Sequence, residues 1–422
     1  MRNATKRTVA SITVSLLTAS ALVGMGTAAQ ATSALNTITV TAPKPGGNTA
    51  SPYKAIVDAF NARYPQYKIN LVEPATEVYP TTLQTKLRAG NAPDVFMVQP
   101  GAGQINSVLP FIKARYLADL SDTKAPKSNP NGIANSVGKG GKTYALAIDQ
   151  TAGAMIYNKT LMTADGLTWP TTFADLLIDC GIARNKGKTF FGFAGSMYAN
   201  GGLMLMNMAG ENVFSTGDQW NAKRIAKSVK FATSSGWQKT MNNVKLMERA
   251  GCFQDGSEAG GFVDAIDNRF FADLSYSVFV PGGTSVAFSN IPFLAGKVFK
   301  TAVFPGSKRL PVSSNYAFAV NAKTKKLWLA KRFINYAASA SVQALGHAAS
   351  GNLPVQNIDP TKLKVQYSEV ASYLKSGKTY TFPNQLWAAP EVYVKMGNAP
   401  AGLITNQVTV DQVLKSMDAA WK

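Results

Sequence analysis

Histidine, cysteine and charged residues are all scarce in this sequence. Its 422 residues include one histidine, His347, and two cysteines, Cys180 and Cys252. A single histidine excludes most catalytic triads and histidine metal sites. Two cysteines exclude a disulfide-dense scaffold and a zinc framework. Charged residues make up 16% of the chain and hydrophobic residues 46%, which excludes a disordered protein. We therefore expect two or three folded domains with neither metal nor cofactor.

The N-terminus has the pattern of a secretory signal peptide. A short basic start precedes an apolar run over residues 9–23, and the small residues Ala29 and Ala31 fit the cleavage rule. The run is shorter than the roughly 20 residues of a spanning helix, which disfavours the alternative of a membrane anchor. We predict a signal peptide over residues 1–31. No cysteine lies near the cleavage site to carry a lipid, so a soluble periplasmic or secreted protein is expected.

The net charge is strongly positive. Lysine and arginine number 43 against 23 acidic residues, a formal charge of +20. Residues 1–31 carry three of the positive charges and no negative one, which leaves +17 on the mature chain. Such a charge attracts anionic solutes, suits an acidic environment or favours a membrane surface. We predict no nucleic-acid partner, because no Lys/Arg-rich run or nucleic-acid-binding motif is present.

An oxidising compartment permits the two cysteines to pair with each other. Closing a loop as long as that between Cys180 and Cys252 stabilises a protein by roughly 4 kcal/mol in the chain-entropy model. Two separate buried thiols are the alternative.

The first part of the mature chain alternates between strand and helix patterns. Period-two alternation predicts a strand over 37–42, and apolar residues at helical spacing predict a helix over 53–64. A strand over 68–72, a helix closed by Gly90 and a continuously apolar strand over 94–98 follow. This order predicts an α/β domain with a parallel sheet. Ligands of such sheets bind beyond the carboxyl ends of the strands.

Several phrases, in order and with matching gaps, carry a family resemblance. They are G-x-x-P-D-V within 89–95, Y-N-K at 157–159, the glycine-led strand at 283–288, the helix over 321–338 and G-x-x-P at 351–354. Together they resemble the extracellular solute-binding proteins of ABC importers, in the sugar-binding family that includes the maltose-binding protein. Phe288 stands where that family commonly has methionine.

The resemblance implies an α/β fold of two lobes that close around a ligand. Each lobe is expected to hold a mixed or mainly parallel sheet flanked by helices, and crossover strands are expected to join the lobes. The N-terminal lobe would comprise residues 32–147 and 295–342, and the C-terminal lobe 148–294 and 343–422. The protein would be a monomeric binding protein without catalytic activity, which delivers a carbohydrate to membrane permease subunits.

A sugar site needs aromatic rings beneath the ligand and polar groups around it. The resemblance places candidate stacking rings at Tyr198, Phe293 and Trp387. Polar side chains in predicted strand-end loops are the candidates for the rim, namely Asn48, Gln99, Asp149, Gln150, Asn200, Asn290 and Asn315. Thr151 replaces Asp149 if the alignment shifts by two residues.

Other functions stay open at this point. Lys44, in the first strand-end loop, would contact phosphate if the solute were a glycerol phosphate or a sugar phosphate. A secreted glycoside-acting enzyme would need a pair of carboxylates, and no local motif nominates one. A structural or adhesive envelope protein would bind no small ligand.

Overall fold

A five-stranded sheet forms the centre of the first lobe. The computed structural model describes residues 36–421 except 46–49, 130–132, 154, 218 and 388. Strand order is β2-β1-β3-β13-β6. The strands are Thr37–Thr41 (β1), Lys68–Val72 (β2), Val95–Val98 (β3), Ala145–Ala147 (β6) and Ala317–Val320 (β13). β1 is parallel to β2 and β3, whereas β13 is antiparallel to β3 and β6.

Local sequence explains the helices on this sheet. Helix α2 (Pro52–Arg63) begins at Ser51, whose side chain accepts the N–H of Lys54, and it buries an apolar face against the sheet. Helix α3 (Tyr79–Ala89) ends at Gly90, which takes the left-handed conformation that glycine favours. The remaining elements of this lobe are α4 (Val108–Lys113), α5 (Ala125–Ser128), α6 (Ala134–Val137), β4 (Gly138–Lys139), β5 (Lys142–Thr143), α13 (Leu327–Ala337) and α14 (Ala340–Ser350).

The second lobe has its own mixed sheet, ordered β11-β8-β10-β9. Its strands are β8 (Ile156–Asn158), β9 (Thr189–Gly192), β10 (Ser275–Val278) and β11 (Phe299–Thr301). Its α-helices are α7 (Lys159–Ala164), α8 (Phe173–Asn185), α9 (Tyr198–Asn212), α10 (Gln219–Ile225), α11 (Ser235–Arg249), α12 (Thr284–Ser289), α15 (Ala371–Ser376), α16 (Pro390–Ile404) and α17 (Val410–Ala420). The π-helix η2 (Val263–Phe270) and the 3-10 turns η3 (Pro292–Leu294), η4 (Val365–Tyr367) and η5 (Pro383–Leu386) complete it.

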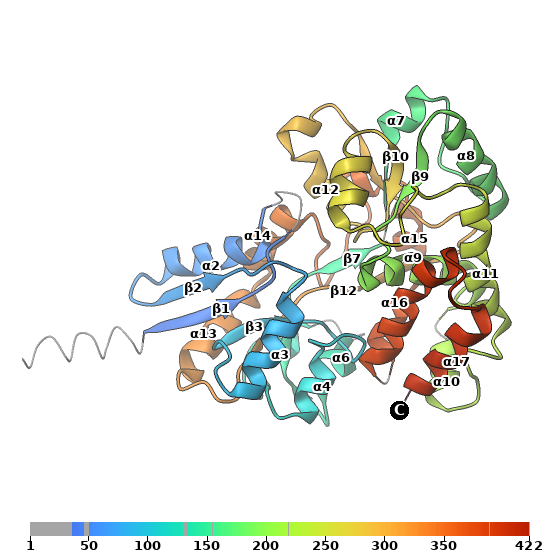
Figure 1. The fold of residues 1–422 in the computed structure, drawn as a ribbon. Coiled ribbons are helices and arrows are strands. Elements are labelled where there is room, and N and C mark those ends of the chain that lie inside the picture. Colours follow the sequence, from blue (N-terminus) through green and yellow to red (C-terminus); the bar gives the residue numbers. More distant parts are fainter. Residues whose placement is uncertain are drawn as a thin grey trace, which may run out of the picture.

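Three segments cross between the lobes (Figure 1). The first leads from β6 into β7 (Gln150–Ala152), and the second leads from β12 (Leu310–Ser314) into β13. These two crossovers pair with each other, because β7 is antiparallel to β12. The third follows α14, and its Leu353 forms a bridge with Gln150. The short strand β14 (Thr379–Tyr380) pairs in parallel with β12.

The lobe boundaries expected from the resemblance need correction. Residues 295–342 were assigned to the first lobe, but β11 pairs with β8 in the second lobe's sheet. The chain therefore stays in the second lobe until it enters β12. Residues 343–350, expected in the second lobe, belong to α14, which packs on α2 of the first lobe. Pairing between strands that are distant in the sequence sets the crossover positions, and the local pattern of apolar residues does not predict that pairing.

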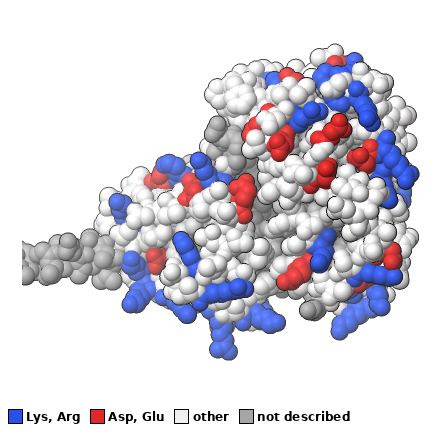
Figure 2. Space-filling view, in the orientation of Figure 1, with Lys and Arg blue, Asp and Glu red and all other residues white. Residues whose placement is uncertain are grey.

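Local interactions fix several elements of the fold. Capping boxes link Thr172 with Asp175 at α8 and Thr409 with Gln412 at α17. Cys180 on α8 and Cys252 form a disulfide. Among the described residues, no helix has the length and apolar character needed to cross a membrane. The predicted signal peptide lies outside the described residues. Lysine and arginine side chains are spread over both lobes on the face in Figure 2.

Candidate ligand-binding junction between the lobes

The three crossovers meet at one buried carboxylate, Asp149. Its Oδ1 accepts the backbone N–H of Tyr316, 3.1 Å away in the second crossover. Its Oδ2 accepts Nδ2 of Asn352, 2.7 Å away in the third crossover. The side chain is 1% exposed. Asp149 thus fastens the crossovers to one another, and both of its oxygens are occupied by protein donors.

Burial raises the pKa of Asp149 to about 7, although hydrogen bonds from Asn352 and from the backbone of Tyr316 act in the opposite direction. Burial also raises the pKa of Tyr316, and the nearby Asp149 raises it further. The hinge region therefore holds a carboxyl group with a pKa near neutral pH, and no lysine or arginine of the described residues pairs with it.

A direct contact joins the lobes beside these crossovers. The loop of residues 99–107 follows β3 in the first lobe, and it touches η5 of the second lobe. A Cβ atom at Gly101 would overlap the backbone of Gln385, and one at Gly103 would overlap the backbone of Asn384. Only glycine permits this approach. We call this place, with the crossover residues around it, the interlobe junction.

Polar atoms without hydrogen-bond partners collect at the junction. They are Oδ1 of Asn106, Oγ1 of Thr151, Nδ2 of Asn315, Oδ1 of Asn384 and Oε1 of Gln385. Asn106 lies in the 99–107 loop, and Nε2 of Gln385 donates to the carbonyl of Ser314 next to Asn315, 2.6 Å away. A buried polar atom without a partner destabilises a fold by about 1–3 kcal/mol. Hydroxyl groups of a ligand would satisfy such atoms, since a hydroxyl both donates and accepts.

Four residues predicted for the site lie on segments of the junction. Gln99 is half-buried at the end of β3, and its side chain makes no hydrogen bond to the described residues. Asn315 is also half-buried, with the unpartnered Nδ2 noted above. The side chains of Asp149 and Gln150 are used within the protein instead. Asp149 accepts from Tyr316 and Asn352, and Nε2 of Gln150 donates to the carbonyl of Val355. Thr151, the alternative to Asp149, keeps an unpartnered hydroxyl.

Two other predicted residues stand at strand ends. Tyr198 begins α9 after β9, packs edge-to-face on Tyr393 with ring centroids 5.7 Å apart, and is half-buried. Lys44 is exposed in the first lobe, where its backbone pairs with Ala75. Its ammonium has no ion-pair partner among the described residues. Asn48 lies outside the described residues.

The expectation that Trp387 stacks on a ligand is corrected by its burial. The side chain is 1% exposed and packs against Phe231 and Trp237, with ring centroids 5.4 and 6.0 Å away. Its indole N–H donates to Asn221 at 3.2 Å. Trp387 is therefore a core residue of the second lobe.

Three further predicted ligand contacts are corrected, Asn200 by its hydrogen-bond partners and Asn290 and Phe293 by their positions. Both ends of the Asn200 amide are used, since Oδ1 accepts the N–H of Ala194 and Nδ2 donates to the carbonyl of Phe279. Asn200 thus ties together the carboxyl ends of β9 and β10. Asn290 and Phe293 are exposed beyond the C-terminus of α12, the end that points away from the crossovers.

Sequence reasoning missed Asn106, Asn384 and Gln385. The signal that could have found the last two is a pair of adjacent amides in a loop between aromatic residues, at 382–387. Asn106 had no such signal, because its role depends on how the 99–107 loop folds back against β3. Among the described residues, no cluster of three or more His, Cys, Asp or Glu side chains is placed to hold a metal ion.

Two α/β lobes, joined by three crossovers and meeting at a polar junction, define a two-lobed binding protein. The chain belongs to the family of bacterial extracellular solute-binding proteins, whose model matches residues 46–344, more than half of the chain. The resemblance noted in the sequence and the predicted fold class are thereby confirmed. The family is one of binding proteins, in agreement with the expectation of a protein without catalytic activity.

Similar proteins agree with this family. The melibiose/raffinose/stachyose-binding protein MelE of Bacillus subtilis (strain 168) is 24% identical over 159 residues, which are 37% of this chain. The match spans 35% of that relative's length.

Solved structures share the fold over most of the chain. A protein from a study of xylan utilisation by Caldanaerobius polysaccharolyticus has a TM-score of 0.78 at 20% identity, covering 91% of this chain and 99% of that one. The GacH receptor of Streptomyces glaucescens, solved unliganded and with acarbose, has a TM-score of 0.71 at 19% identity, covering 91% and 97%. A sugar transporter of Bacillus licheniformis in complex with stachyose has a TM-score of 0.68 at 19% identity, covering 91% and 99%.

Proposed function

We propose that the protein binds an oligosaccharide between its lobes and delivers it to the permease of an ABC importer. The observation that carries this proposal is the set of unpartnered amide and hydroxyl atoms at the interlobe junction. Neutral polyols match such a set, because each hydroxyl both donates and accepts a hydrogen bond. The relatives that bind melibiose, raffinose, stachyose or acarbose support the same ligand class.

Binding must favour the closed arrangement of the lobes if it is to signal to a permease. A ligand shifts this equilibrium only by its difference in affinity for the two states. The junction supplies such a difference, because Asn384 and Gln385 belong to one lobe and Asn106 to the other. A ligand that bonds to both lobes is held fully only when they meet.

Calorimetric titration of residues 32–422 tests the proposal. The panel holds melibiose, raffinose, stachyose, xylo-oligosaccharides and chito-oligosaccharides. We expect saturable binding of at least one neutral oligosaccharide, with a smaller radius of gyration in solution scattering when it is bound. The double variant N106A/N384A should weaken that binding at least tenfold. The matched control Asn290→Ala, exposed beyond α12, should leave it unchanged. Equal affinity in both variants would refute the site.

Two other outcomes replace the proposal with a defined alternative. Binding confined to glycerol phosphate or sugar phosphates, and lost in Lys44→Ala, would make the protein a binder of anionic solutes. Shortened products after incubation with a bound oligosaccharide would make it a glycoside-acting enzyme.

We propose further that residues 1–31 direct export and are removed. The mature chain would then start at Thr32 and carry no lipid, since the cysteines at 180 and 252 are far from that end. Intact-mass measurement of the protein from its native host tests this. A mass that includes residues 1–31, in a membrane fraction, would overturn it.

A further inference from the structure

A hollow of the described structure lies away from the interlobe junction, at the outer edge of the second lobe. The segment of residues 252–260 runs beside β9, where Phe191 donates to the carbonyl of Cys252 and Gly195 donates to that of Ser257. This segment, the ends of α8 and α11, and η2 enclose a hollow of about 780 Å³. The disulfide between Cys180 and Cys252 fastens α8 to the segment.

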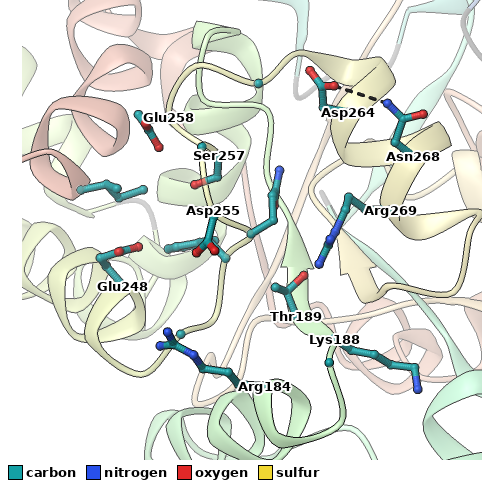
Figure 3. Close-up of a pocket in the computed structure, with 17 residues that line it drawn as sticks. Arg184, Lys188, Thr189, Glu248, Asp255, Ser257, Glu258, Asp264, Asn268 and Arg269 are labelled. Atoms are coloured by element: carbon teal, nitrogen blue, oxygen red, sulfur yellow. Dashed lines mark hydrogen bonds between the residues drawn. The ribbon is translucent and has the colours of Figure 1, made fainter.

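Charged side chains line this hollow, and several of them have no partner (Figure 3). Lys188 pairs with Asp165, and Asp264 accepts a hydrogen bond from Asn268. Glu248, Asp255 and Glu258 stand on one side, and Arg269 stands across from them. Arg184 lies at the α8 end. None of the three carboxylates, nor Arg184, makes a side-chain hydrogen bond or ion pair with any described residue. Arg269 donates only to the carbonyl of Leu274, at 3.3 Å, and its Nε has no partner.

Burial and neighbouring charges shift the pKa values of two groups that line the hollow. Burial raises the pKa of Glu248, and the neighbouring carboxylates of Glu258 and Asp255 raise it further. Burial lowers the pKa of Arg269, and the nearby Asp255 acts in the opposite direction. Three carboxylates thus gather on one side of the hollow, while Arg184, Lys188 and Arg269 line its other parts.

Ser257 provides an independent sign of a ligand. The residue is 1% exposed, and its Oγ has no hydrogen-bond partner. Its carbonyl accepts the backbone N–H of Gly195 at 2.8 Å, which fixes the backbone of Ser257 beside the chain that follows β9. Figure 3 shows its hydroxyl on the side of the carboxylates, within the lining of the hollow. A buried hydroxyl in this setting is suited to a ligand atom.

The arrangement of charge selects the class of ligand. A metal ion does not fit, because the carboxylates of the described residues form no cluster close enough to coordinate one. An organic cation would be attracted to the carboxylate side, and a carboxylate of the same molecule would face Arg269, whose fork-shaped donors match it. The hollow is also within the range of roughly 300–1,000 Å³ typical of small-molecule sites.

We propose that this hollow is a second ligand site, separate from the interlobe junction, which binds a small zwitterion of the amino-acid or short-peptide class. The ammonium group lies among Glu248, Asp255 and Glu258, where Ser257 completes its hydrogen bonds. The carboxylate binds to Arg269. Because the site lies within one lobe, its occupancy does not require the lobes to close.

Saturation-transfer NMR on residues 32–422 tests the site, since it detects weak ligands. The probes are lysine, Ala-Ala, Lys-Ala and, as an uncharged comparison, N-acetyl-alanine amide. We expect transfer to at least one zwitterion and none to the uncharged probe. The double variant E248Q/E258Q should reduce that transfer at least fivefold. The control Asp267→Asn, on η2 but outside the lining, should leave it unchanged.

Ser257→Ala separates ligand binding from folding. It removes an unpartnered hydroxyl, so the melting temperature should stay the same or rise while zwitterion binding falls. Zwitterion signals that are absent at millimolar concentration, or that persist in E248Q/E258Q, would overturn the proposal. The proposal would also fail if these variants abolished the NMR signal of a neutral oligosaccharide instead of that of a zwitterion. Calorimetry of N106A/N384A reports on the junction alone, so the two sites succeed or fail independently.

Discussion

Nδ2 of Asn352 donates to Oδ2 of Asp149 across 2.7 Å, and the two residues are 203 positions apart in the chain. Both are buried, at 7% and 1% exposure. The bond joins the first crossover to the third, while the backbone of Tyr316 joins the second to the same carboxylate. The hinge of this two-lobed protein is therefore fastened by one carboxyl group rather than by strand pairing alone.

Removing the donor tests this fastening. Asn352→Ala leaves Oδ2 of Asp149 buried without a partner, so the free energy of unfolding should fall by about 1–3 kcal/mol at pH 8. Urea denaturation measures the loss. The control Asn290→Ala, at an exposed helix end, should stay within about 0.5 kcal/mol of the wild type. Equal losses in the two variants would show that the bond contributes nothing specific.

The pH dependence of stability should carry the signature of Asp149. Its pKa is about 7 in the folded state against 3.8 for a model carboxyl, so between these values the folded protein binds more protons than the unfolded chain. The contribution of Asp149 to the free energy of unfolding should therefore fall as the pH rises from about 4 to 7, by up to about 4 kcal/mol. The full stabilisation is present only below this window.

Asp149→Asn provides the comparison. We expect the stability of the wild type relative to this variant to decline from pH 4 to 7 and to level off above pH 8. Both proteins contain His347, whose pKa is lowered by burial, so its opposite contribution cancels in the difference. Parallel stability curves for the two proteins would contradict the raised pKa.

Gly103 should control closure. A Cβ atom at this position would overlap the backbone of Asn384, so Gly103→Ala should hold the lobes apart. We expect the dissociation constant for the oligosaccharide to rise at least tenfold, with a larger radius of gyration in the presence of ligand. Gly181→Ala, where a Cβ atom meets nothing within 4 Å on α8, should leave affinity unchanged. It should stabilise the fold by about 0.5–1 kcal/mol. If the lobes of Gly103→Ala closed around the ligand as those of the wild type do, the close contact between Gly103 and Asn384 would be ruled out.

Trp387 should behave as a core residue. Trp387→Ala should lower the free energy of unfolding by about 3–5 kcal/mol, because it leaves a cavity beside Phe231 and Trp237. Calorimetry below the unfolding transition should show near-normal affinity in the molecules that remain folded. A stable variant with lost affinity would restore the stacking role that its position in the sequence predicts.

The disulfide should stabilise the second lobe. It closes a loop of 72 residues, so C180A/C252A should lose roughly 4 kcal/mol in urea denaturation. Treating the wild type with reductant under the same conditions should reproduce the loss. A midpoint that does not change on reduction would show that the bond is not formed in solution.

Local features could be predicted because they depend on neighbours a few residues apart. The alternation over 37–41, the buried face of α2 and the stop at Gly90 each follow from side-chain period and backbone preference. The capping boxes at Thr172 and Thr409 follow from hydrogen bonds that span three residues. The family phrases added the two-lobed arrangement, which no single element implies.

The site was less predictable because it depends on contacts between distant segments. Trp387 is a large ring that suits a sugar face or a core equally well, and only the packing of α10 and α11 against it decided for the core. Asn200 and Asp149 are polar in strand-end loops, as a rim residue would be, yet partners far along the chain occupy both. Asn106 carries no local signal, and the adjacent amides at 384 and 385 come into place only where η5 meets the 99–107 loop.

The sequence by itself therefore determined the first elements, the class of fold and the family, since these rest on short-range periodicity and on phrases in a fixed order. The strand expected over 283–288 is helix α12 instead. Only the tertiary structure decided which polar groups are left without partners. A polar group lacks a partner when its side chain can make more hydrogen bonds than the folded chain offers it. That condition exists only once segments as distant as Asp149 and Asn352, or Gly103 and Asn384, have come together.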